Sequence, residues 1–370
     1  MTFPFAYHFY RTTAEAWEAM FQGVSAATQS IYWEVYIFLD DEVGNRFIQL
    51  MCDKARAGVE VKLIIDAIGS ADLSGAALAR LRGSGVEVLR FHPPYPEFSW
   101  RHFWRRISHR THRKTLIIDE ETVFLGGVNI MASCGSWDDL HVEIRGPLVR
   151  PLLRAFAKSY LAAGGERGAV RHLLHPKLAL HLPEWREWRE KIRFIIHSPQ
   201  HPRTARLRQL YRDSLRMARE SVNLLTPYYV PDRQFLRAVA AARRRGVKVN
   251  LFIPTRLDHR IMEWAARAYY AATARAGADI FLLPRMHHGK AMSVDSTLGF
   301  IGSGNLNRRS FYWDEESGIA FSEANMVRDL NLLFNDWRRE AVPLLREAWE
   351  KRGFWQKLQE WGARRIEDYL

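Results

Sequence analysis

Cysteine is scarce in this chain of 370 residues, in which only Cys52 and Cys134 occur. Two cysteines are too few for a disulfide framework, so a reducing cytoplasm is the expected compartment. Long apolar runs are also lacking, and no stretch approaches the roughly 18 apolar residues of a membrane span. The first residues contain no basic region followed by an apolar stretch. We therefore expect neither a signal peptide nor a transmembrane helix.

Acidic residues are fewer than basic ones: the chain has 41 aspartates and glutamates but 54 lysines and arginines, which gives a net charge of +13. A basic excess suits a polyanion, either nucleic acid or an anionic lipid surface, and charge alone does not choose between them. The sequence also lacks a carboxylate cluster of the kind that a two-metal phosphodiesterase needs. We expect no metal and no cofactor.

A repeated octamer is the most informative pattern that is present. Residues 112–119 and residues 288–295 both follow the pattern His-x-Lys-x4-Asp. Counted from each histidine, the repeat continues with phenylalanine at +12, glycine at +14 and asparagine at +17. These later pairs are Phe124 and Phe300, Gly126 and Gly302, and Asn129 and Asn305. Two copies in register indicate a duplicated active-site half, and two halves imply one shared site.

The repeat extends upstream into apolar segments that are typical of buried strands. Residues 58–65 resemble residues 246–253, and residues 85–89 resemble residues 277–281. Each segment follows a helical stretch rich in alanine and arginine. The first strand of each half is expected at 31–38 and at 222–225. Each half is thus predicted as strand, helix, strand, helix, strand and then the motif strand, which is an α/β sandwich with helices on both faces of a sheet.

Two domains are expected from the length of the chain and from the position of the repeat. Three glycines, Gly164, Gly165 and Gly168, lie just before a segment with two prolines. We place the first domain at 1–168, a linker at 169–190, and the second domain with a C-terminal amphipathic helix at 191–370. Docking against its own domain is the favoured role of that helix, ahead of contact with a membrane interface.

The histidine and the lysine of each motif form the expected centre of the chemistry. If each motif is extended, His112 and Lys114 project from the same face, as do His288 and Lys290. An imidazole beside an ammonium group makes a pair that binds and attacks phosphate. The motif aspartates, Asp119 and Asp295, complete the candidate catalytic set, and strand parity predicts a structural or outer role for them.

Amide and carboxylate residues complete each half of the predicted site. Asn129 and Asn305 each follow a glycine-rich turn and are expected to donate to a phosphoryl oxygen. Each imidazole also needs a carboxylate to orient it. Asp139 at +27 from His112 and Glu316 at +28 from His288 are the preferred partners. A turn residue for the asparagines and a surface ion pair for the carboxylates are the structural alternatives.

The two motifs resemble those of the phospholipase D superfamily, whose two-motif members form a pseudo-twofold dimer of halves around one active site. Within this superfamily, the flanking segments are most similar to those of bacterial cardiolipin synthases. The resemblance covers roughly residues 30–340, and it departs at the N-terminus, where many members carry transmembrane helices. The segments that carry it are 36–41, 65–70, 112–114, 137–141, 146–147, 227–231 and 305–311.

The resemblance implies a covalent phosphohistidine intermediate. It assigns His112 as the nucleophile and His288 as the acid and base. The two lysines and the two asparagines would hold the phosphate oxygens as charge develops. The candidate substrate-binding residues are His141, Tyr228, Ser303 and Arg309. Aromatic and basic residues just before the first motif are predicted to contact a membrane, and they are Trp100, Phe103, Trp104, Arg105 and Arg106.

The leading hypothesis is a phosphatidyltransferase that joins two phosphatidylglycerols into cardiolipin and releases glycerol. A hydrolase that yields phosphatidic acid, a metal-independent nuclease, and a catalytically inactive membrane-binding module are the alternatives. The expected partners are anionic phospholipids at the inner face of a bacterial membrane, bound peripherally, with no specific nucleic acid. The flanking segments, and not the octamers themselves, point to lipid.

Overall fold

The chain divides into two compact units in a computed structural model. The model describes residues 5–93, 108–174, 188, 190–199, 206–345, 349 and 352–365. The first unit comprises residues 1–190 together with Asp314–Ser317, and the second comprises residues 191–313 and 318–370. Four residues that lie late in the sequence thus belong to the first unit. Each unit is described by itself below.

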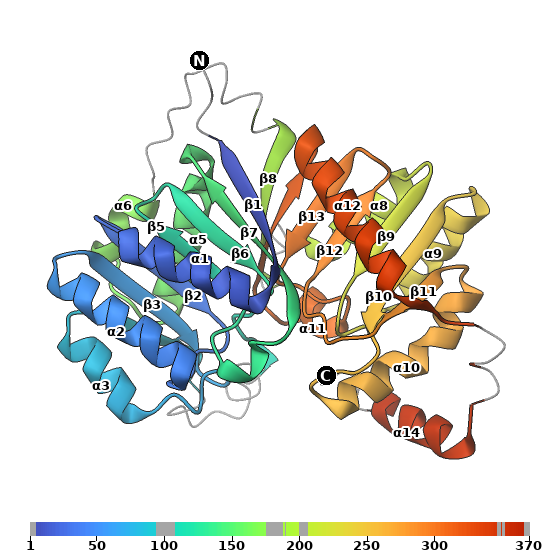
Figure 1. Ribbon diagram of the computed structural model, residues 1–370, viewed down its shortest axis with the longest axis horizontal. Coiled ribbons are helices and arrows are strands. Elements are labelled where there is room, and N and C mark those ends of the chain that lie inside the picture. The colour runs from blue at the N-terminus through green and yellow to red at the C-terminus, as the bar shows by residue number, and fades with distance from the viewer. Residues whose placement is uncertain are drawn as a thin grey trace. The chain divides into compact units, whose positions relative to one another are not determined.

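The first unit is a seven-stranded sheet between two layers of helices (Figure 1). The strand order is β1-β7-β6-β5-β2-β3-β4; β2, β3 and β4 run parallel, and β5 runs antiparallel to β2. Its strands are β1 (Ala6–Thr12), β2 (Ser30–Val35), β3 (Glu60–Asp66), β4 (Glu87–Phe91), β5 (Thr115–Ile118), β6 (Thr122–Gly126) and β7 (Asp138–Arg145). Its helices are α1 (Thr13–Ala26), α2 (Glu42–Arg56), α3 (Gly75–Gly83), α5 (Arg150–Ala162) and α6 (Arg171–Leu174), with the 3₁₀ turns η1 (Ala132–Cys134), η2 (Pro147–Val149) and η3 (Gly168–Val170).

Local sequence signals set these elements. Thr12 and Glu15 form a capping box at the start of α1, and Asp41 accepts from the Gly44 N–H at the start of α2. Helices α1, α2 and α3 pack on one face of the sheet, and α5 packs on the other face against β2 and β4. All six residues of β2 are buried, because both faces of this central strand are covered.

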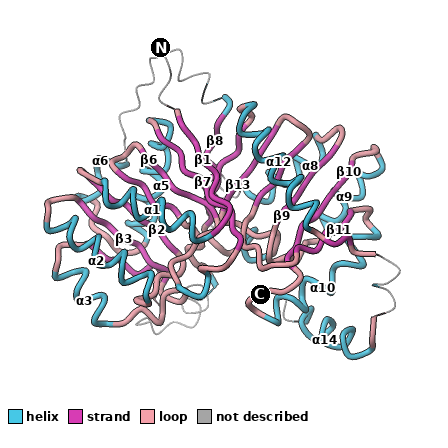
Figure 2. Tube along the Cα trace, viewed as in Figure 1, coloured by secondary structure: helices cyan, strands magenta, loops and turns pink. Residues whose placement is uncertain are grey.

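The second unit repeats this architecture (Figure 2). Its strand order is β15-β11-β10-β9-β12-β13-β14-β8, with β9, β10 and β11 parallel and β12 antiparallel to β9. Its strands are β8 (Ile192–His197), β9 (Ser221–Leu225), β10 (Lys248–Pro254), β11 (Asp279–Leu283), β12 (Ala291–Val294), β13 (Leu298–Gly302), β14 (Glu316–Phe321) and β15 (Val342–Pro343). Its helices are α8 (Leu207–Met217), α9 (Arg233–Arg244), α10 (Arg260–Arg275), α11 (Arg308–Tyr312), α12 (Ala324–Glu340) and α14 (Phe354–Arg365).

The two sheets confirm the predicted α/β class with two similar halves. Each half follows the expected order of strand, helix, strand, helix, strand and motif strand. The prediction of the first strand was wrong, because β1 and β8 precede the strands expected to open each half. Both are edge strands among the described residues: β1 lies beside β7 at one end of its sheet, and β8 lies beside β14 at one end of the other sheet. The residues of β1 are partly exposed, so its sequence lacks the apolar run that marks a buried strand.

The C-terminal segment packs on the second unit. Strand β15 adds to the sheet beside β11, and helix α14 packs against α10. The helix therefore docks on its own domain, which is the role that the sequence favoured. In the predicted linker at 169–190, residues 169–174 form the end of η3 and α6, and Val170 and Leu173 there are buried. Over the described ranges, every helix is too short or too polar to cross a bilayer.

Candidate active site

The first motif lies where the parallel strands of its sheet end. Strand β5 runs antiparallel to β2, with Thr115 opposite Glu34, so His112 and Lys114 lie at the carboxyl end of β2. The second motif has the same place, because Ala291 pairs with Leu225 at the carboxyl end of β9. Open α/β sheets bind their ligands at this edge. The duplicated sequence therefore gives two equivalent sets of chemistry-bearing residues.

The motif aspartates lie at the other end of the same strands and hold the backbone there. Asp119 and Asp295 both adopt a positive φ, 50° and 51°, in the turn after the motif strand. Each carboxylate accepts from three backbone N–H groups that lead into the neighbouring strand, at 2.7–3.2 Å. The donors are Thr28, Gln29 and Ser30 for Asp119, and Arg219, Glu220 and Ser221 for Asp295. These hydrogen bonds fit the structural role predicted for both aspartates.

These hydrogen bonds also set the acidity of the two carboxyl groups. Partial burial alone would raise the pKa of Asp119, but the N–H donors outweigh it and hold that pKa below its usual value. The pKa of Asp295 is lowered in the same way. Both groups are therefore ionised at neutral pH and serve as fixed acceptors.

His112 is paired with the carboxylate of Glu316. Its Nδ1 lies 3.1 Å from each carboxylate oxygen, and both side chains are buried. The carboxylate accepts a hydrogen bond from the Nδ1–H group, so the lone pair of this imidazole is at Nε2. The spacing in the sequence predicted Glu316 as the partner of His288, and that pairing was wrong. Glu316 is instead the carboxylate of the first motif.

Glu316 pairs with His112 and not with the predicted His288 because residues 314–317 belong to the first unit. The backbone of Glu315 brackets the first motif: its N–H donates to the Arg110 carbonyl at 2.8 Å, and its carbonyl accepts from the His112 N–H at 2.9 Å. Arg113 adds side-chain bonds to the Glu315 carboxylate and, at 3.3 Å, to the Glu316 carbonyl. The spacing of residues within the repeat could not predict this long-range backbone pairing.

The strand register shows that Asp139 and Glu316 are true equivalents. In the first sheet Gly126 pairs with His141, and Asp139 precedes that residue by two. In the second sheet Gly302 pairs with Gly318, and Glu316 precedes that residue by two. The one-residue difference between +27 and +28 therefore arises in the connection that precedes β7 in one half and β14 in the other. Asp139 is buried. The sequence paired it with His112, but Glu316 takes the place at His112 Nδ1, so that pairing was wrong as well.

Each lysine folds back onto the histidine of its own motif. Lys114 Nζ donates to the His112 carbonyl at 2.9 Å and lies 5.0 Å from the centre of the Tyr36 ring. Lys290 Nζ donates to the His288 carbonyl and, at 2.9 Å, to His288 Nε2. Both lysines are buried, so their positive charges act in a region of low dielectric. The arrangement suits the binding of a phosphate beside each imidazole.

A tyrosine contacts each histidine. The Tyr36 ring meets His112 edge-on with centroids 4.9 Å apart, and the Tyr228 ring meets His288 at 6.1 Å. Tyr228 was predicted as a substrate-binding residue, whereas Tyr36 was missed. Tyr36 directly follows β2 and Tyr228 closely follows β9, so their equivalence is visible only once the strand ends are known. The hydroxyl of Tyr228 donates to Asp258 at 2.6 Å.

The two asparagines are buried but differ in their contacts. The Asn129 amide oxygen accepts from the Ile37 N–H at 3.4 Å, and the Asn129 carbonyl accepts from the Trp17 indole at 2.8 Å. The amide oxygen of Asn305 has no hydrogen-bond partner among the described residues. Asn129 thus has a partly structural role. The predicted contact of both amides with a phosphoryl oxygen stays a prediction.

His141 is a neutral buried histidine. Burial lowers its pKa to about 4, Lys114 adds to this effect, and Asp139 opposes it. Its Nδ1 accepts from the Val128 N–H at 3.4 Å, which places the proton on Nε2. That Nε2 lacks a partner within the described part of the chain. If His141 contacts a phosphate as predicted, it does so as a neutral donor and not as a cation.

A buried charge network, missed by the sequence reasoning, anchors the residues that lead into the first motif. Arg110 donates to both oxygens of Asp66 at 2.7–2.9 Å, and Thr111 donates through its N–H to Asp66 and through its hydroxyl to Glu34. Burial raises the pKa of Glu34, while Arg113 and Thr111 oppose that rise. Arg110 and Arg113, on either side of His112 in the sequence, were the signal from which this network could have been predicted.

The remaining predicted residues are placed as follows. Ser303 is buried directly after β13, and Arg309 lies in α11. Their predicted contacts with substrate stay predictions. Over the described ranges, no group of three His, Cys, Asp or Glu side chains is arranged to hold a metal ion. The five predicted membrane-contact residues, Trp100, Phe103, Trp104, Arg105 and Arg106, lie outside the described residues.

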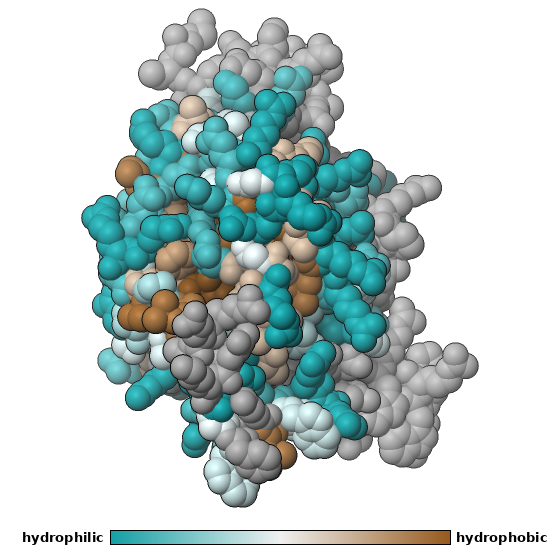
Figure 3. All heavy atoms as spheres, turned by 90° about the vertical axis from the view of Figure 1, so that its right-hand side faces the viewer, coloured by the Kyte–Doolittle hydropathy of each residue, from teal (hydrophilic) through white to brown (hydrophobic). Residues whose placement is uncertain are grey.

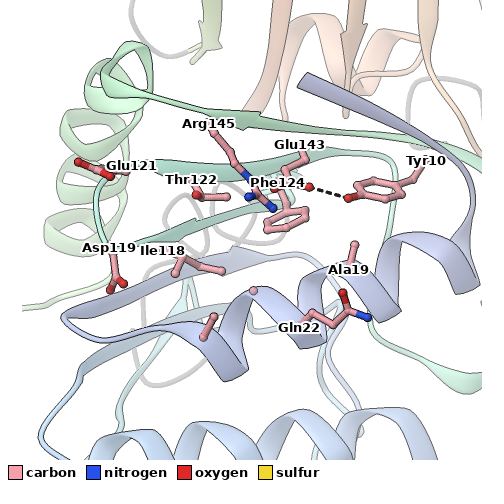
Figure 4. Close-up of a pocket in the computed structure, with 12 residues that line it drawn as sticks. Tyr10, Ala19, Gln22, Ile118, Asp119, Glu121, Thr122, Phe124, Glu143 and Arg145 are labelled. Carbon is pink, nitrogen blue, oxygen red and sulfur yellow. Dashed lines mark hydrogen bonds and ion pairs between the residues drawn. The ribbon is translucent and has the colours of Figure 1, made fainter. Parts of the chain in front are cut away.

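A surface pocket of about 360 Å³ lies at the Asp119 end of the first sheet, away from the motif histidine (Figure 4). Tyr10, Glu143 and Arg145 line it, and the Tyr10 hydroxyl donates to Glu143 at 2.6 Å. Burial and this bond raise the pKa of Tyr10, so the phenol stays protonated. Because its polar groups are paired with one another, we assign the pocket no chemistry.

Comparison with known proteins finds matches along nearly the whole chain. A family model described as "Cardiolipin synthase, PLD-like domain" matches residues 20–159 and 211–337. A cardiolipin synthase of Geobacillus kaustophilus (strain HTA426) is 30% identical over 364 residues, which cover 96% of this chain and 70% of that protein. A probable cardiolipin synthase of Bacillus subtilis (strain 168), YwiE, is 27% identical over 358 residues, covering 95% of this chain and 69% of that protein.

A solved structure shares the fold. The phosphatidylserine synthase of Haemophilus influenzae Rd KW20 superposes with a TM-score of 0.73 at 16% identity, covering 99% of this chain and 97% of that one. At this identity the likeness concerns the fold alone. The duplicated α/β architecture described above is therefore one that has been seen by experiment.

Proposed function

Since the chain belongs to the cardiolipin synthase PLD-like domain family, we propose that it is a phosphatidyltransferase that makes cardiolipin from two phosphatidylglycerols and releases glycerol. The buried pair of His112 and Glu316 carries this proposal. A carboxylate that holds the Nδ1 proton leaves the Nε2 lone pair for attack on phosphorus. The buried Lys114 beside it supplies positive charge for the phosphate oxygens.

In the first half-reaction, Nε2 of His112 attacks the phosphorus of one phosphatidylglycerol. A bond forms between nitrogen and phosphorus, and the bond from phosphorus to the glycerol oxygen breaks. His288 gives its proton to that oxygen, so glycerol leaves as a neutral alcohol. Lys114 and Lys290 bind the non-bridging oxygens, whose negative charge grows in the transition state.

In the second half-reaction, a hydroxyl of the second phosphatidylglycerol displaces the histidine. His288 removes the hydroxyl proton, the new bond from phosphorus to oxygen forms, and the bond to His112 breaks. The enzyme returns to its starting protonation state. Transfer to the lipid hydroxyl must outcompete transfer to water, so water has to be limited once the first lipid is bound.

We also propose that the enzyme works peripherally at the cytoplasmic face of a bacterial membrane. Its substrates are lipids, and its net charge of +13 favours attraction to a leaflet that carries anionic headgroups. The charge is equally compatible with nucleic acid, so single-stranded DNA serves as the competing substrate in the test.

Product analysis tests the function. The full chain is incubated with phosphatidylglycerol in detergent micelles without divalent metal, and lipids and glycerol are quantified by mass spectrometry. Cardiolipin and glycerol in a one-to-one ratio are expected. Phosphatidic acid as the only lipid product would establish a hydrolase instead, and cleavage of DNA without lipid turnover would establish a nuclease.

Three variants tie the products to the motifs. His112→Ala and His288→Ala should each abolish cardiolipin formation, whereas His8→Ala, at an exposed position of β1, should leave it unchanged. Mass spectrometry of rapidly quenched enzyme should find a phosphatidyl group on His112. A phosphatidyl group on His288 would reverse the roles of the two histidines.

A further inference from the structure

Three large apolar side chains of helix α14 are exposed. Trp355 is 73% exposed, Trp361 57% and Leu358 42%. At 3.6 residues per turn, these three residues fall within about 120° of the helix circumference. They form one continuous apolar face of a helix whose opposite side packs against α10.

The side of α14 that packs on the protein is small and polar. Ala363 is buried, and Glu360, only 3% exposed, forms a two-pronged ion pair with Arg352 at 2.7–3.0 Å. The helix thus buries a carboxylate and leaves its two described tryptophans in contact with solvent. This polarity is the reverse of that of an ordinary surface helix, whose apolar stripe faces the core.

Basic groups flank the exposed face. The Arg365 guanidinium lies 4.5 Å from the centre of the Trp361 ring, and Arg364 lies 5.3 Å from the Tyr269 ring. Figure 3 shows one face of the protein, on which hydrophobic residues gather in one area among mostly hydrophilic ones.

We propose that this face of α14, formed by Trp355, Leu358, Trp361 and Arg365, docks the enzyme on an anionic membrane surface. Exposed tryptophans beside arginines suit a lipid interface, where the rings enter the headgroup region and the guanidinium groups meet lipid phosphates. The net charge of +13 complements a negative membrane surface and a lipid partner in particular. The proposal rests on the proposed function only in that the substrate is a membrane lipid.

Vesicle binding by the full chain tests the proposal apart from catalysis. Sedimentation with vesicles of phosphatidylglycerol and phosphatidylcholine is compared for the natural chain and for Trp355→Ser/Trp361→Ser. We expect the double variant to bind roughly tenfold or more weakly. The natural chain should also show a blue shift of tryptophan fluorescence on binding, and the double variant should show a smaller shift.

Matched controls separate docking from loss of fold. Met217→Ser and Leu332→Ser remove side chains that are equally exposed on α8 and α12, and each should bind vesicles like the natural chain. With detergent-dispersed phosphatidylglycerol, the double variant should keep the turnover of the natural chain. Unchanged vesicle binding by the double variant would overturn the proposal. Tryptophan-dependent dimerisation in analytical ultracentrifugation would overturn it in favour of a protein partner.

Discussion

The carboxylate of Glu316 determines which nitrogen of His112 carries a proton. In Glu316→Gln, the amide NH₂ group competes with the acceptor oxygen at Nδ1, so the proton moves to Nε2 and the nucleophilic lone pair is lost. We expect kcat for cardiolipin formation to fall roughly 10²- to 10⁴-fold, with KM little changed. Steady-state kinetics over a pH series will measure both constants.

A matched carboxylate away from the site controls for that experiment. Glu121→Gln removes an exposed charge and should keep the kcat of the natural chain. If Glu316→Gln keeps more than a tenth of the natural kcat, the proposed role of Glu316 as the orienting carboxylate is incorrect.

We expect the motif aspartates to act on stability and not on the chemical step. Asp119→Asn and Asp295→Asn each weaken hydrogen bonds to backbone N–H groups, which should lower the free energy of unfolding at pH 7 by about 1–2 kcal/mol. The estimate is at the low end for charged hydrogen bonds because both carboxylates are partly exposed to solvent. Urea unfolding followed by circular dichroism measures the change.

The pH dependence of this effect has a definite sign. The folded-state pKa of each aspartate lies below its ordinary value of 3.8, so its ionised form stabilises the fold fully above about pH 5. The stabilisation is lost as the pH falls through the folded-state pKa, and the difference between natural and variant chains should shrink there. A difference that grows in acid would contradict the structural role.

At the scale of elements, Arg113 holds residues 314–317 against the first motif. Its guanidinium binds the carboxylate of Glu315, the carbonyl of Glu316 and the hydroxyl of Ser159, and it lies 3.7 Å from Glu34. Arg113→Lys keeps the charge but cannot make these bonds together. We expect kcat to fall roughly 10- to 100-fold, because the backbone that positions Glu316 is loosened.

Removal of the charge should affect folding as well. Arg113→Met leaves buried carboxylates without a counter-charge and should destabilise the chain by about 3–5 kcal/mol. Differential scanning calorimetry will show the loss, and Arg145→Lys, a change at an exposed arginine that is paired with Glu143, is the control. A fully active Arg113→Lys variant would mean that the segment is held by other contacts.

The sequence predicts elements best where they are buried on both sides. Strands β2, β3, β5 and their counterparts in the second unit are almost wholly buried and rich in apolar residues, and they were located correctly. Strand β1 was missed because it is a partly exposed edge strand. The partner of His112 was also missed, since spacing within a repeat describes neighbours along the chain and not the backbone pairing that carries Glu316 to the first motif.

At the scale of the whole molecule, the excess of positive charge should govern membrane attraction. An increase in ionic strength from 0.1 M to 1 M shortens the screening length from about 10 Å to about 3 Å. We expect binding to vesicles that contain phosphatidylglycerol to weaken roughly tenfold or more over this range, while binding to phosphatidylcholine vesicles changes little. Sedimentation at several salt concentrations measures both. Equal salt dependence for the two lipids would exclude a charge-driven encounter.

The separation of His112 and Glu316 by 204 positions has a consequence for synthesis of the protein. A ribosome adds about 5–20 residues per second, so the histidine is made roughly 10–40 s before its carboxylate. During that interval the emerging first unit lacks the carboxylate that the proposed mechanism places beside His112. We therefore expect a growing chain to be inert toward phosphodiesters until Glu316 has been added, and a fragment that ends before Glu316 to be inactive.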